Sequence, residues 1–360
     1  MLEKIIPCEI KNFSTCKHKE SDMLIDKPKL DNIRNNKVNV GPINRIMKEE
    51  FELVKKIGSG CESEVYHIIN KKRKINLALK KIKPKNGKIN PVELYISKTL
   101  KYKNIIQVYH IYKDIEQNSD YVLMEHGTYG NLIDFQHKFL KNNYFTESLL
   151  NFIVYQILQA LNYCHKCHVL HLDLKPQNII IDEYLNVKLI DFSISLKYNF
   201  IKSEKVEMKP CGTTFFIAPE VHKSKTIEKK DLNKIDLYSL GVIIYLFAFG
   251  EFPFGLDKKT KDFDKIIETI DNNDLKINNE DNNYSTYFID FLKKLLEKDI
   301  NKRISIDESL NHYWVKGAEI IMREKEKIYN AGSFLGYLIT DHFLNFNQYL
   351  NGDIEKLQCF

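Results

Sequence analysis

The sequence lacks the features that mark exported or membrane-spanning proteins. Its first seven residues hold no long apolar stretch and residue 2 is Leu, so neither a signal peptide nor the N-myristoylation pattern is expected. The longest apolar run, residues 240–249, is too short to cross a bilayer, and runs of this length usually form buried core helices. We therefore expect no membrane span.

The sequence also carries little excess charge of either sign. The formal net charge is only +6 in a chain of 42.5 kDa, a mild bias that does not predict a nucleic-acid partner. With 360 residues, of which 43% are hydrophobic, the chain can bury a large core. We expect a soluble globular protein with more than one domain.

The seven cysteines show no disulfide framework. Their number is odd and their spacing is irregular, which is typical of reduced thiols in the cytoplasm, with the nucleus as the alternative location. Residues 164–168, Cys-His-Lys-Cys-His, have the spacing of a c-type haem attachment motif. Haem attachment needs export to an oxidising compartment, so we interpret this segment as a helix end, with zinc binding as the remaining alternative.

The hydrophobic pattern divides the chain. Residues 1–50 show no clean period and are expected to form an N-terminal extension. Beyond them, short alternating stretches and one helical stretch predict a small antiparallel lobe of five strands and one helix. The strands are expected at residues 51–57, 64–69, 77–82, 105–112 and 121–125, and the helix at residues 91–100.

After Gly127 the apolar spacing becomes helical and predicts a larger lobe. Two short strands, residues 179–182 and 187–190, flank a turn and are expected to form a hairpin. Residues 316–360 form a tail with apolar groups that docks on the large lobe or meets a partner; we favour docking. The helices of the larger lobe are expected at residues 149–163, 237–249, 263–270 and 287–296.

Three short motifs carry the chemistry. The run His171 to Asn178 reads His-Leu-Asp-Leu-Lys-Pro-Gln-Asn, and it is followed by Asp-Phe-Ser at 191–193 and Ala-Pro-Glu at 218–220. A carboxylate that can accept a hydroxyl proton, an ammonium that can meet a phosphate, and an amide with a second carboxylate for metal are the parts that phosphoryl transfer needs.

These motifs resemble those of the eukaryotic protein kinases, with the resemblance running from about residue 51 to residue 315. It implies an α+β bilobal fold with a small lobe at 51–125, a hinge at 125–128 and a mostly helical lobe at 129–315. It implies ATP and Mg²⁺ as cofactors and protein substrates as partners. Lys175 favours transfer to Ser and Thr, because tyrosine-directed members usually lack Lys there.

The resemblance implies roles for individual residues. Asp173 matches the catalytic base, Lys175 the residue that neutralises the γ-phosphate, and Asn178 and Asp191 the metal ligands, which suit Mg²⁺. Thr213 matches the hydroxyl that ties Asp173 to Lys175. The positions that match nucleotide-binding residues are Ile57, Gly58, Ser59, Gly60, Val65, Ala78, Lys80, Glu93, Met124, Glu125, Gly127 and Ile180.

Two of these assignments have competitors. Lys81 and Lys83 are alternatives to Lys80, and strand parity separates them only partly; the run Ala78-Leu79-Lys80 favours Lys80. Glu93 matches the helix Glu that orients this Lys, by register with residues 103–106. Three further residues match scaffold positions: Glu220 and Arg303 as an ion pair, and Asp236 as the carboxylate that holds the catalytic loop.

The chain departs from the family at several positions. Ser63 replaces the third loop Gly, which kinases tolerate. Leu172 replaces the Arg that usually pairs with a phosphate on the activation segment, so we expect phosphorylation there not to be the main switch. Ser193 replaces the Gly after Asp191-Phe192 and is expected to bias that segment toward one state. The last two motivate an alternative, a catalytically silent scaffold.

Substrate preference is predicted from three uncharged positions. Kinases that select upstream Arg often place carboxylates where this chain has Asn131, Gln177 and Leu246. We therefore expect weak selection for upstream Arg. Four hydroxyls between Asp191 and Glu220 are candidates for modification: Ser195, Ser203, Thr213 and Thr214.

Overall fold

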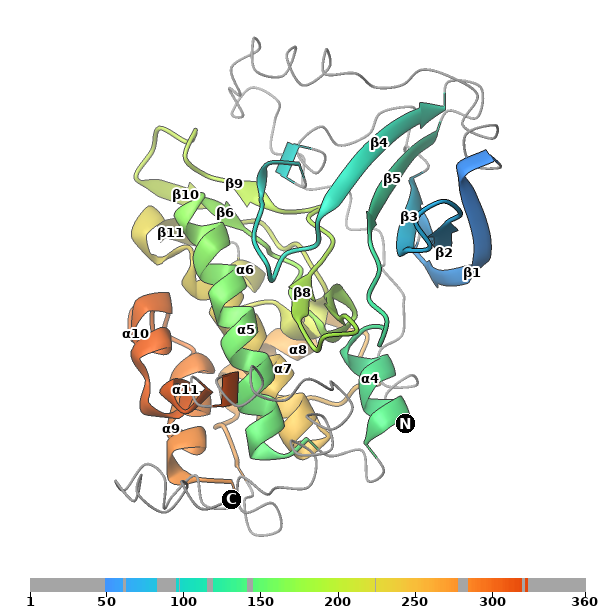
Figure 1. Ribbon diagram of the computed structural model, residues 1–360. Helices are drawn as coiled ribbons and strands as arrows, with labels where there is room; N and C mark the ends of the chain where they lie inside the picture. Colours follow the sequence, from blue (N-terminus) through green and yellow to red (C-terminus); the bar gives the residue numbers. More distant parts are fainter. Residues whose placement is uncertain are drawn as a thin grey trace.

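The chain forms a small sheet lobe and a larger helical lobe (Figure 1). A computed structural model describes residues 49–60, 63–82, 95–96, 98–114, 119–140, 145–223, 225–277, 284–318 and 321–322. The expected α+β bilobal fold is confirmed. The predictions for residues 1–48 and for the tail beyond Met322 fall outside the described residues.

Five antiparallel strands make the small lobe, in the order β1-β2-β3-β5-β4. The predicted strand at 105–112 begins three residues late, because Ile105 makes only an isolated bridge to Leu189. The predicted helix at 91–100 is described only in part, with helical backbone at Tyr95, Ile96, Lys98 and Thr99. The strands are β1 (Phe51–Ser59), β2 (Ser63–Asn70), β3 (Asn76–Ile82), β4 (Val108–Asp114) and β5 (Ser119–Glu125).

Strand register separates Lys80 from Lys81. Lys80 lies opposite Val65 on β2 and Val122 on β5, and directly opposed residues of antiparallel strands share a face. Lys81 therefore points to the other face, where its Nζ lies 5.5 Å from the centroid of the Tyr121 ring. Lys83 lies outside the described residues.

Two helices form the centre of the large lobe. In α5 (Glu147–Lys166) the Thr146 side chain accepts from the Leu149 amide at the first turn, and most side chains are buried. In α7 (Lys234–Phe249) every residue but the last is buried. Around them lie α4 (Leu132–Phe139), α6 (Pro219–His222), α8 (Phe263–Asn272), α9 (Thr286–Leu295), α10 (Ile306–Asn311) and α11 (Tyr313–Lys316).

One stretch, Lys229–Phe249, which contains α7, is long and apolar enough to cross a membrane by length and composition. Its mean hydropathy is 1.4, and 89% of its apolar window is buried inside the fold. A helix that is hydrophobic on all sides is expected at the centre of a large lobe. We therefore interpret it as the core helix.

The predicted hairpin after the catalytic loop is present as β7 (Ile179–Ile181) and β8 (Val187–Leu189). The Asp182 carboxylate builds its turn by accepting from the Tyr184 and Asn186 amides at 2.9 and 2.8 Å. The remaining short elements are β6 (Val169–Leu170), β9 (Leu196–Lys197), β10 (Lys205–Glu207) and β11 (Thr226–Glu228), with 3₁₀ turns η3 (Pro176–Asn178), η4 (Thr214–Phe216), η5 (Lys229–Asp231) and η6 (Pro253–Gly255).

The Cys-His segment ends α5. Cys164 has no exposed surface, and burial raises the pKa of its thiol well above the ordinary value, which disfavours the thiolate that a metal would need. Cys167 is the C-cap residue, and His165 is bonded to Asp236. Within the described part of the chain, no three His, Cys, Asp or Glu side chains gather as a metal site. This placement fits the helix-end interpretation.

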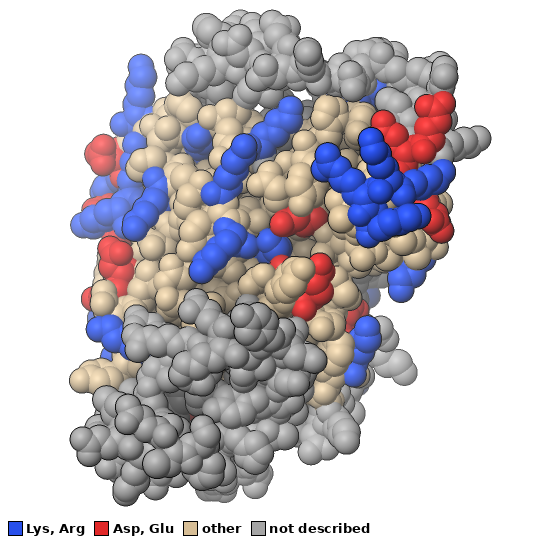
Figure 2. Space-filling model, in the orientation of Figure 1, with Lys and Arg blue, Asp and Glu red and all other residues tan. Residues whose placement is uncertain are grey.

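Charge is unevenly spread on the surface. Figure 2 shows Lys and Arg side chains gathered over β1 to β3, where residues Lys71 to Lys74 form an exposed basic turn between β2 and β3. Acidic side chains lie beside this group, and the rest of the face shown mixes both signs. Such mixing fits the mild net charge.

Candidate active site

Three side chains contact the Asp173 carboxylate, two from the loop at residues 171–178, called the catalytic loop below, and one from Thr213. The Thr213 hydroxyl donates to Oδ1 at 2.8 Å, and Lys175 Nζ lies 2.7 Å from Oδ2. Lys175 Nζ also donates to Thr213 Oγ1 at 2.9 Å, which closes the triangle. The structure thus joins the sequence-predicted residues of the catalytic loop to the hydroxyl 40 residues further along the chain.

Asn178 holds the same carboxylate from the other side. Its Nδ2 donates to Asp173 Oδ2 at 3.0 Å and to the Asp173 carbonyl at 2.8 Å. Both amide hydrogens are therefore used within the loop. The amide oxygen of Asn178 is the atom left for a cation.

A fully buried carboxylate fixes the loop backbone. Asp236 Oδ1 accepts from the Leu172 amide at 2.9 Å, and Oδ2 accepts from the His171 amide at 3.0 Å and from His165 Nε2 at 2.8 Å. Burial would raise the pKa of the Asp236 carboxyl, but the hydrogen bond from His165 and the charges of the His165 and His171 imidazoles outweigh it and hold the pKa below its ordinary value. Leu172 is thereby held at a φ of 64°.

Lys80 reaches across the two lobes to Asp191. Its Nζ lies 3.1 Å from Asp191 Oδ1. Burial would raise the pKa of Asp191, but the charge and hydrogen bond of Lys80, the charge of Lys175 and a hydrogen bond from Ser193 lower it to about 2. Asp191 is therefore ionised at physiological pH, as a metal ligand must be.

Ser193 is a site residue whose contribution the sequence argument missed. Its side chain hydrogen-bonds the Asp191 carboxylate. The φ above zero in this segment belongs to Asp191 itself, at 65°. The sequence signal was a hydroxyl two residues after Asp191. The contact between this hydroxyl and the Asp191 carboxylate is visible only in the folded structure.

The hinge is built from close packing and one ion pair. A Cβ at Gly127 would lie 2.8 Å from Ile180 Cδ1, so only glycine allows this approach. Glu125 accepts from the Gln107 amide at 2.9 Å and pairs with Lys188 Nζ at 2.9 Å. Lys188 is a second residue that sequence reasoning missed, because its partner lies 63 residues away.

Two imidazoles stack beside the hinge. The His67 and His126 ring centroids are 4.1 Å apart, with 19° between the planes. Burial, and then the neighbouring His67, lower the pKa of His126 to about 4. His126 is therefore neutral at physiological pH and adds no charge to the hinge.

The remaining nucleotide-type residues lie on the small sheet. Ala78 lies opposite both Met124 and His67, and Gly58 lies opposite Val65, so these residues frame the inner face near Lys80. Ile57 is 42% exposed on β1, beside Ser59 and Gly60. Glu93 lies outside the described residues.

The donor set suits a hard cation. Within the described residues it consists of the Asn178 amide oxygen and the Asp191 carboxylate, with no cluster of three His, Cys, Asp or Glu side chains. Mg²⁺ keeps several waters and binds through one or two protein oxygens together with substrate phosphates. Asn178 and Asp191 are the residues that would hold it.

The activation segment, residues 191–220, is anchored by two short strand pairings. β9 pairs with β6 next to the catalytic loop, and β10 pairs with β11 beyond α6. Val206 and Met208 are buried at this second ladder. Gly212, at a φ of 99°, packs so closely on the Leu172 carbonyl that a Cβ would lie 2.5 Å from its oxygen.

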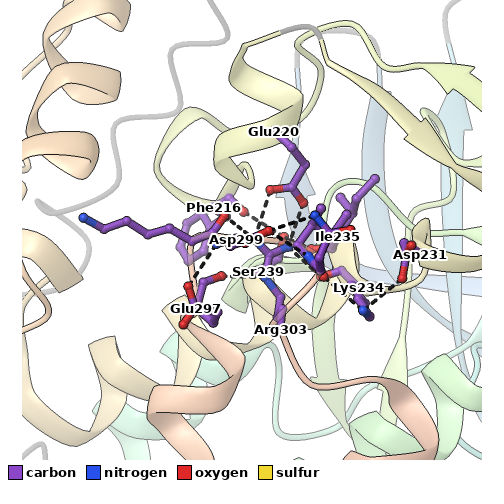
Figure 3. Close-up of polar contacts among 12 residues, drawn as sticks. Phe216, Glu220, Asp231, Lys234, Ile235, Ser239, Glu297, Asp299 and Arg303 are labelled. Carbon is purple, nitrogen blue, oxygen red and sulfur yellow. Dashed lines mark hydrogen bonds and ion pairs between the residues drawn. The ribbon is translucent and has the colours of Figure 1, made fainter.

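A buried ion pair fixes the end of this segment. Arg303 binds both oxygens of Glu220, at 2.6 and 3.0 Å. Figure 3 shows the two side chains facing each other beside Lys234 and Glu297, whose backbone carbonyls accept two further hydrogen bonds from Arg303. Both side chains are at most 3% exposed. The scaffold pair expected from the sequence is formed.

Comparison with known proteins gives a family. The model of the protein kinase domain matches residues 51–315. The chain is 29% identical over 303 residues to "Probable serine/threonine-protein kinase fhkA" of Dictyostelium discoideum, covering 74% of this chain and 50% of that protein. It is 33% identical over 266 residues to "Calcium-dependent protein kinase 6" of Plasmodium berghei, covering 72% and 17%.

A third relative is "Testis-specific serine/threonine-protein kinase 1" of Mus musculus, 29% identical over 269 residues, which cover 72% of this chain and 70% of that protein. The chain thus spans about half the length of the Dictyostelium relative and a smaller part of the Plasmodium one.

We predict that Arg303→Met lowers the free energy of unfolding by about 3–5 kcal/mol, because it leaves the Glu220 carboxylate buried without its partner. Urea unfolding measures the change. The double variant Glu220→Leu, Arg303→Met should lose much less, since no buried charge remains. Lys294→Met, which breaks the exposed pair with Asp290, is the matched control and should cost at most about 1 kcal/mol. Equal losses for Arg303→Met and Lys294→Met would contradict the prediction.

Proposed function

This chain belongs to the protein kinase family, and we propose that it transfers the γ-phosphoryl group of ATP to Ser and Thr hydroxyls of protein substrates. One observation carries the proposal: the Asp173 carboxylate is aimed by Thr213, Lys175 and Asn178, while Lys80 is paired with Asp191. The names of the relatives support the Ser/Thr class.

In the proposed mechanism Asp173 accepts the proton of the substrate hydroxyl. The hydroxyl oxygen forms a bond to the γ-phosphorus of ATP, while the bond between that phosphorus and the oxygen that leaves with ADP breaks. Thr213 and Asn178 hold the carboxylate in place, so little rearrangement is needed at the moment of transfer. Lys175, 2.7 Å from this carboxylate, is placed to meet the charge that develops on the transferred group.

Lys80 is proposed to bind the α- and β-phosphates of ATP, and Asp191 and Asn178 to hold Mg²⁺. Bound Mg²⁺ would supply neutralisation of the phosphate charge. Asp191 remains a carboxylate for this role because its pKa is about 2. Gly127 and Ile180, in direct contact, are proposed to line the adenine side of the site.

The domain limits also belong to the proposal. We assign residues 51–315 to the catalytic unit, 1–50 to an N-terminal extension and 316–360 to a tail. Ala318 and Ile321 at the start of the tail are buried, which supports docking on the large lobe. A cytoplasmic location, with the nucleus as the alternative, is supported by the irregular cysteine spacing.

We predict that Asp173→Asn lowers transfer of radiolabelled phosphate from ATP to a generic protein substrate by about 10²–10⁴-fold, the usual contribution of a general base. Asn keeps the shape of Asp but cannot take the proton. The matched control is Asp264→Asn, an exposed carboxylate on α8, which should transfer at the wild-type rate. Equal signals from wild type and Asp173→Asn would instead favour the silent scaffold.

Regulation is proposed to be independent of a phosphate on the activation segment. Leu172 is 8% exposed within the main hydrophobic core and offers no charge. Ser195 is buried with its hydroxyl donating to the His171 carbonyl, and Thr213 is engaged by Asp173. Ser203, exposed between β9 and β10, is the accessible hydroxyl of these three.

Phosphatase treatment of the purified protein is therefore expected to leave most of its activity, because the segment is held by β6, β11 and Arg303 rather than by a phosphate. Activity assays before and after treatment, with the phosphorylation state checked by mass spectrometry, measure this. Ser203→Ala should behave like the treated wild type. A large loss in either sample would show that a phosphate holds the segment.

Weak selection for Arg upstream of the phosphorylated residue is also proposed. Asn131 uses its side-chain oxygen to cap α4, accepting from the Ile133 and Asp134 amides, and Leu246 is 1% exposed. Asp134, a nearby carboxylate, accepts from the Asn131 amide in the same capping box. The side chains at Asn131 and Leu246 are thus occupied by structural contacts, and neither carries a charge that would attract a guanidinium.

A peptide library with every residue varied around a fixed Ser should therefore show no dominant preference for upstream Arg. The variant Gln177→Glu, which restores one carboxylate, is expected to raise the relative rate for upstream-Arg peptides. A strong Arg preference in the wild type would refute the assignment.

A further inference from the structure

One cation of the activation segment has an unusual set of partners. Lys197, at the end of β9, lies with its Nζ 3.2 Å from the Tyr95 hydroxyl and 4.5 Å from the centroid of the Tyr95 ring. The centroid of the Phe200 ring lies 5.6 Å from the same Nζ. Among the described residues no carboxylate lies within ion-pair distance of Lys197. The ammonium is thus held by two aromatic rings from two different segments.

Each side of this contact is fixed by further contacts, and both Ile96 and Leu196 belong to the main hydrophobic cluster. The backbone of Lys197 pairs with Val169 on β6, two residues before His171, and the next residue, Tyr198, bonds the His168 carbonyl. Tyr95 belongs to a helical segment in which the Thr99 hydroxyl donates to the Tyr95 carbonyl. The side chain of the adjacent Ile96 is fully buried. In Figure 1 this short helical segment lies beside β9.

The contact therefore joins two parts of the site. Tyr95 follows, by two positions, the residue that the sequence predicts to orient Lys80, and Lys197 follows Asp191 by six positions. Leu172 leaves the chain without the Arg through which a phosphate would tie such segments. A cation near aromatic rings is attracted by the negative ring faces. Such a contact forms without phosphorylation of the chain.

We propose that Lys197 is a positioning residue that holds the helical segment of Tyr95 against the activation segment, and so keeps Lys80 and Asp191 aligned. Its effect on catalysis rests on the proposed function. The contact itself does not, so structure and activity can be tested separately.

The experiment compares the full-length wild type with Lys197→Met, Lys197→Arg, Tyr95→Leu and the double variant Lys197→Met, Tyr95→Leu. Hydrogen exchange is followed in a peptide covering residues 95–100, whose Leu100 amide donates to the Ile96 carbonyl at 2.9 Å. The kcat and the peptide KM are measured on the same samples. Lys202→Met, an exposed Lys of the same segment, is the matched control.

Lys197→Met and Tyr95→Leu should each speed exchange in this peptide and lower kcat by about three- to thirtyfold, the range that cation–π contacts represent, with the peptide KM nearly unchanged. Lys197→Arg should restore both readouts, because Arg keeps the cation and stacks on rings. The double variant should be no worse than either single variant, and Lys202→Met should match the wild type.

Unchanged exchange in Lys197→Met, failure of Arg to rescue, additive losses in the double variant, or faster exchange spread over the whole chain would each overturn the proposal. If the wild type transfers no phosphate, the proposed function fails, while the exchange of the 95–100 peptide still decides whether Lys197 holds this segment.

Discussion

The geometry of the catalytic loop depends on one buried carboxylate, Asp236. It lies at the start of the core helix α7 and receives the His171 and Leu172 amides, so the loop backbone is tied to the most deeply buried element of the large lobe. Without acceptors these two donors would be buried unsatisfied. This contact allows Leu172 to hold a left-handed φ and places Asp173 one residue later. The orientation of the proposed base, Asp173, therefore depends on the attachment of the loop backbone to the buried helix α7.

Ion pairs connect residues of the small lobe to residues of the large lobe. Lys80 meets Asp191 across the lobes, and Glu125 in the hinge meets Lys188 on β8. These pairs are partly shielded from water, where charge interactions are stronger than on an open surface. The lowered pKa of Asp191 expresses this coupling, because its ionised form is what Lys80 stabilises. Two ion pairs thus connect the sheet lobe to the helical lobe.

The activation segment is held mainly by backbone pairing and buried side chains. Its anchoring consists of strand pairing, buried apolar side chains and the Glu220–Arg303 pair at its end. A hydrophobic residue at 172 is consistent with this arrangement, because the Leu172 side chain is buried in the main hydrophobic cluster. The Lys197–Tyr95 contact adds a further interaction between this segment and the helical segment of Tyr95. These contacts support the proposal that the segment is ordered without an added phosphate.

Much of this protein could be predicted from local pattern: the alternating strands of the small lobe, the helical spacing of α5 and α7, and the residue types of the catalytic loop, whose short spacing already limits how far Asp173 and Asn178 can separate. Register and long-range pairing could not. Lys80 differs from Lys81 only by the face that strand pairing assigns, and Ser193, Lys188 and Lys197 acquire roles from distant partners. Sequence specifies which groups are available within a few residues, whereas contacts between segments far apart in the chain exist only once the core has brought them together.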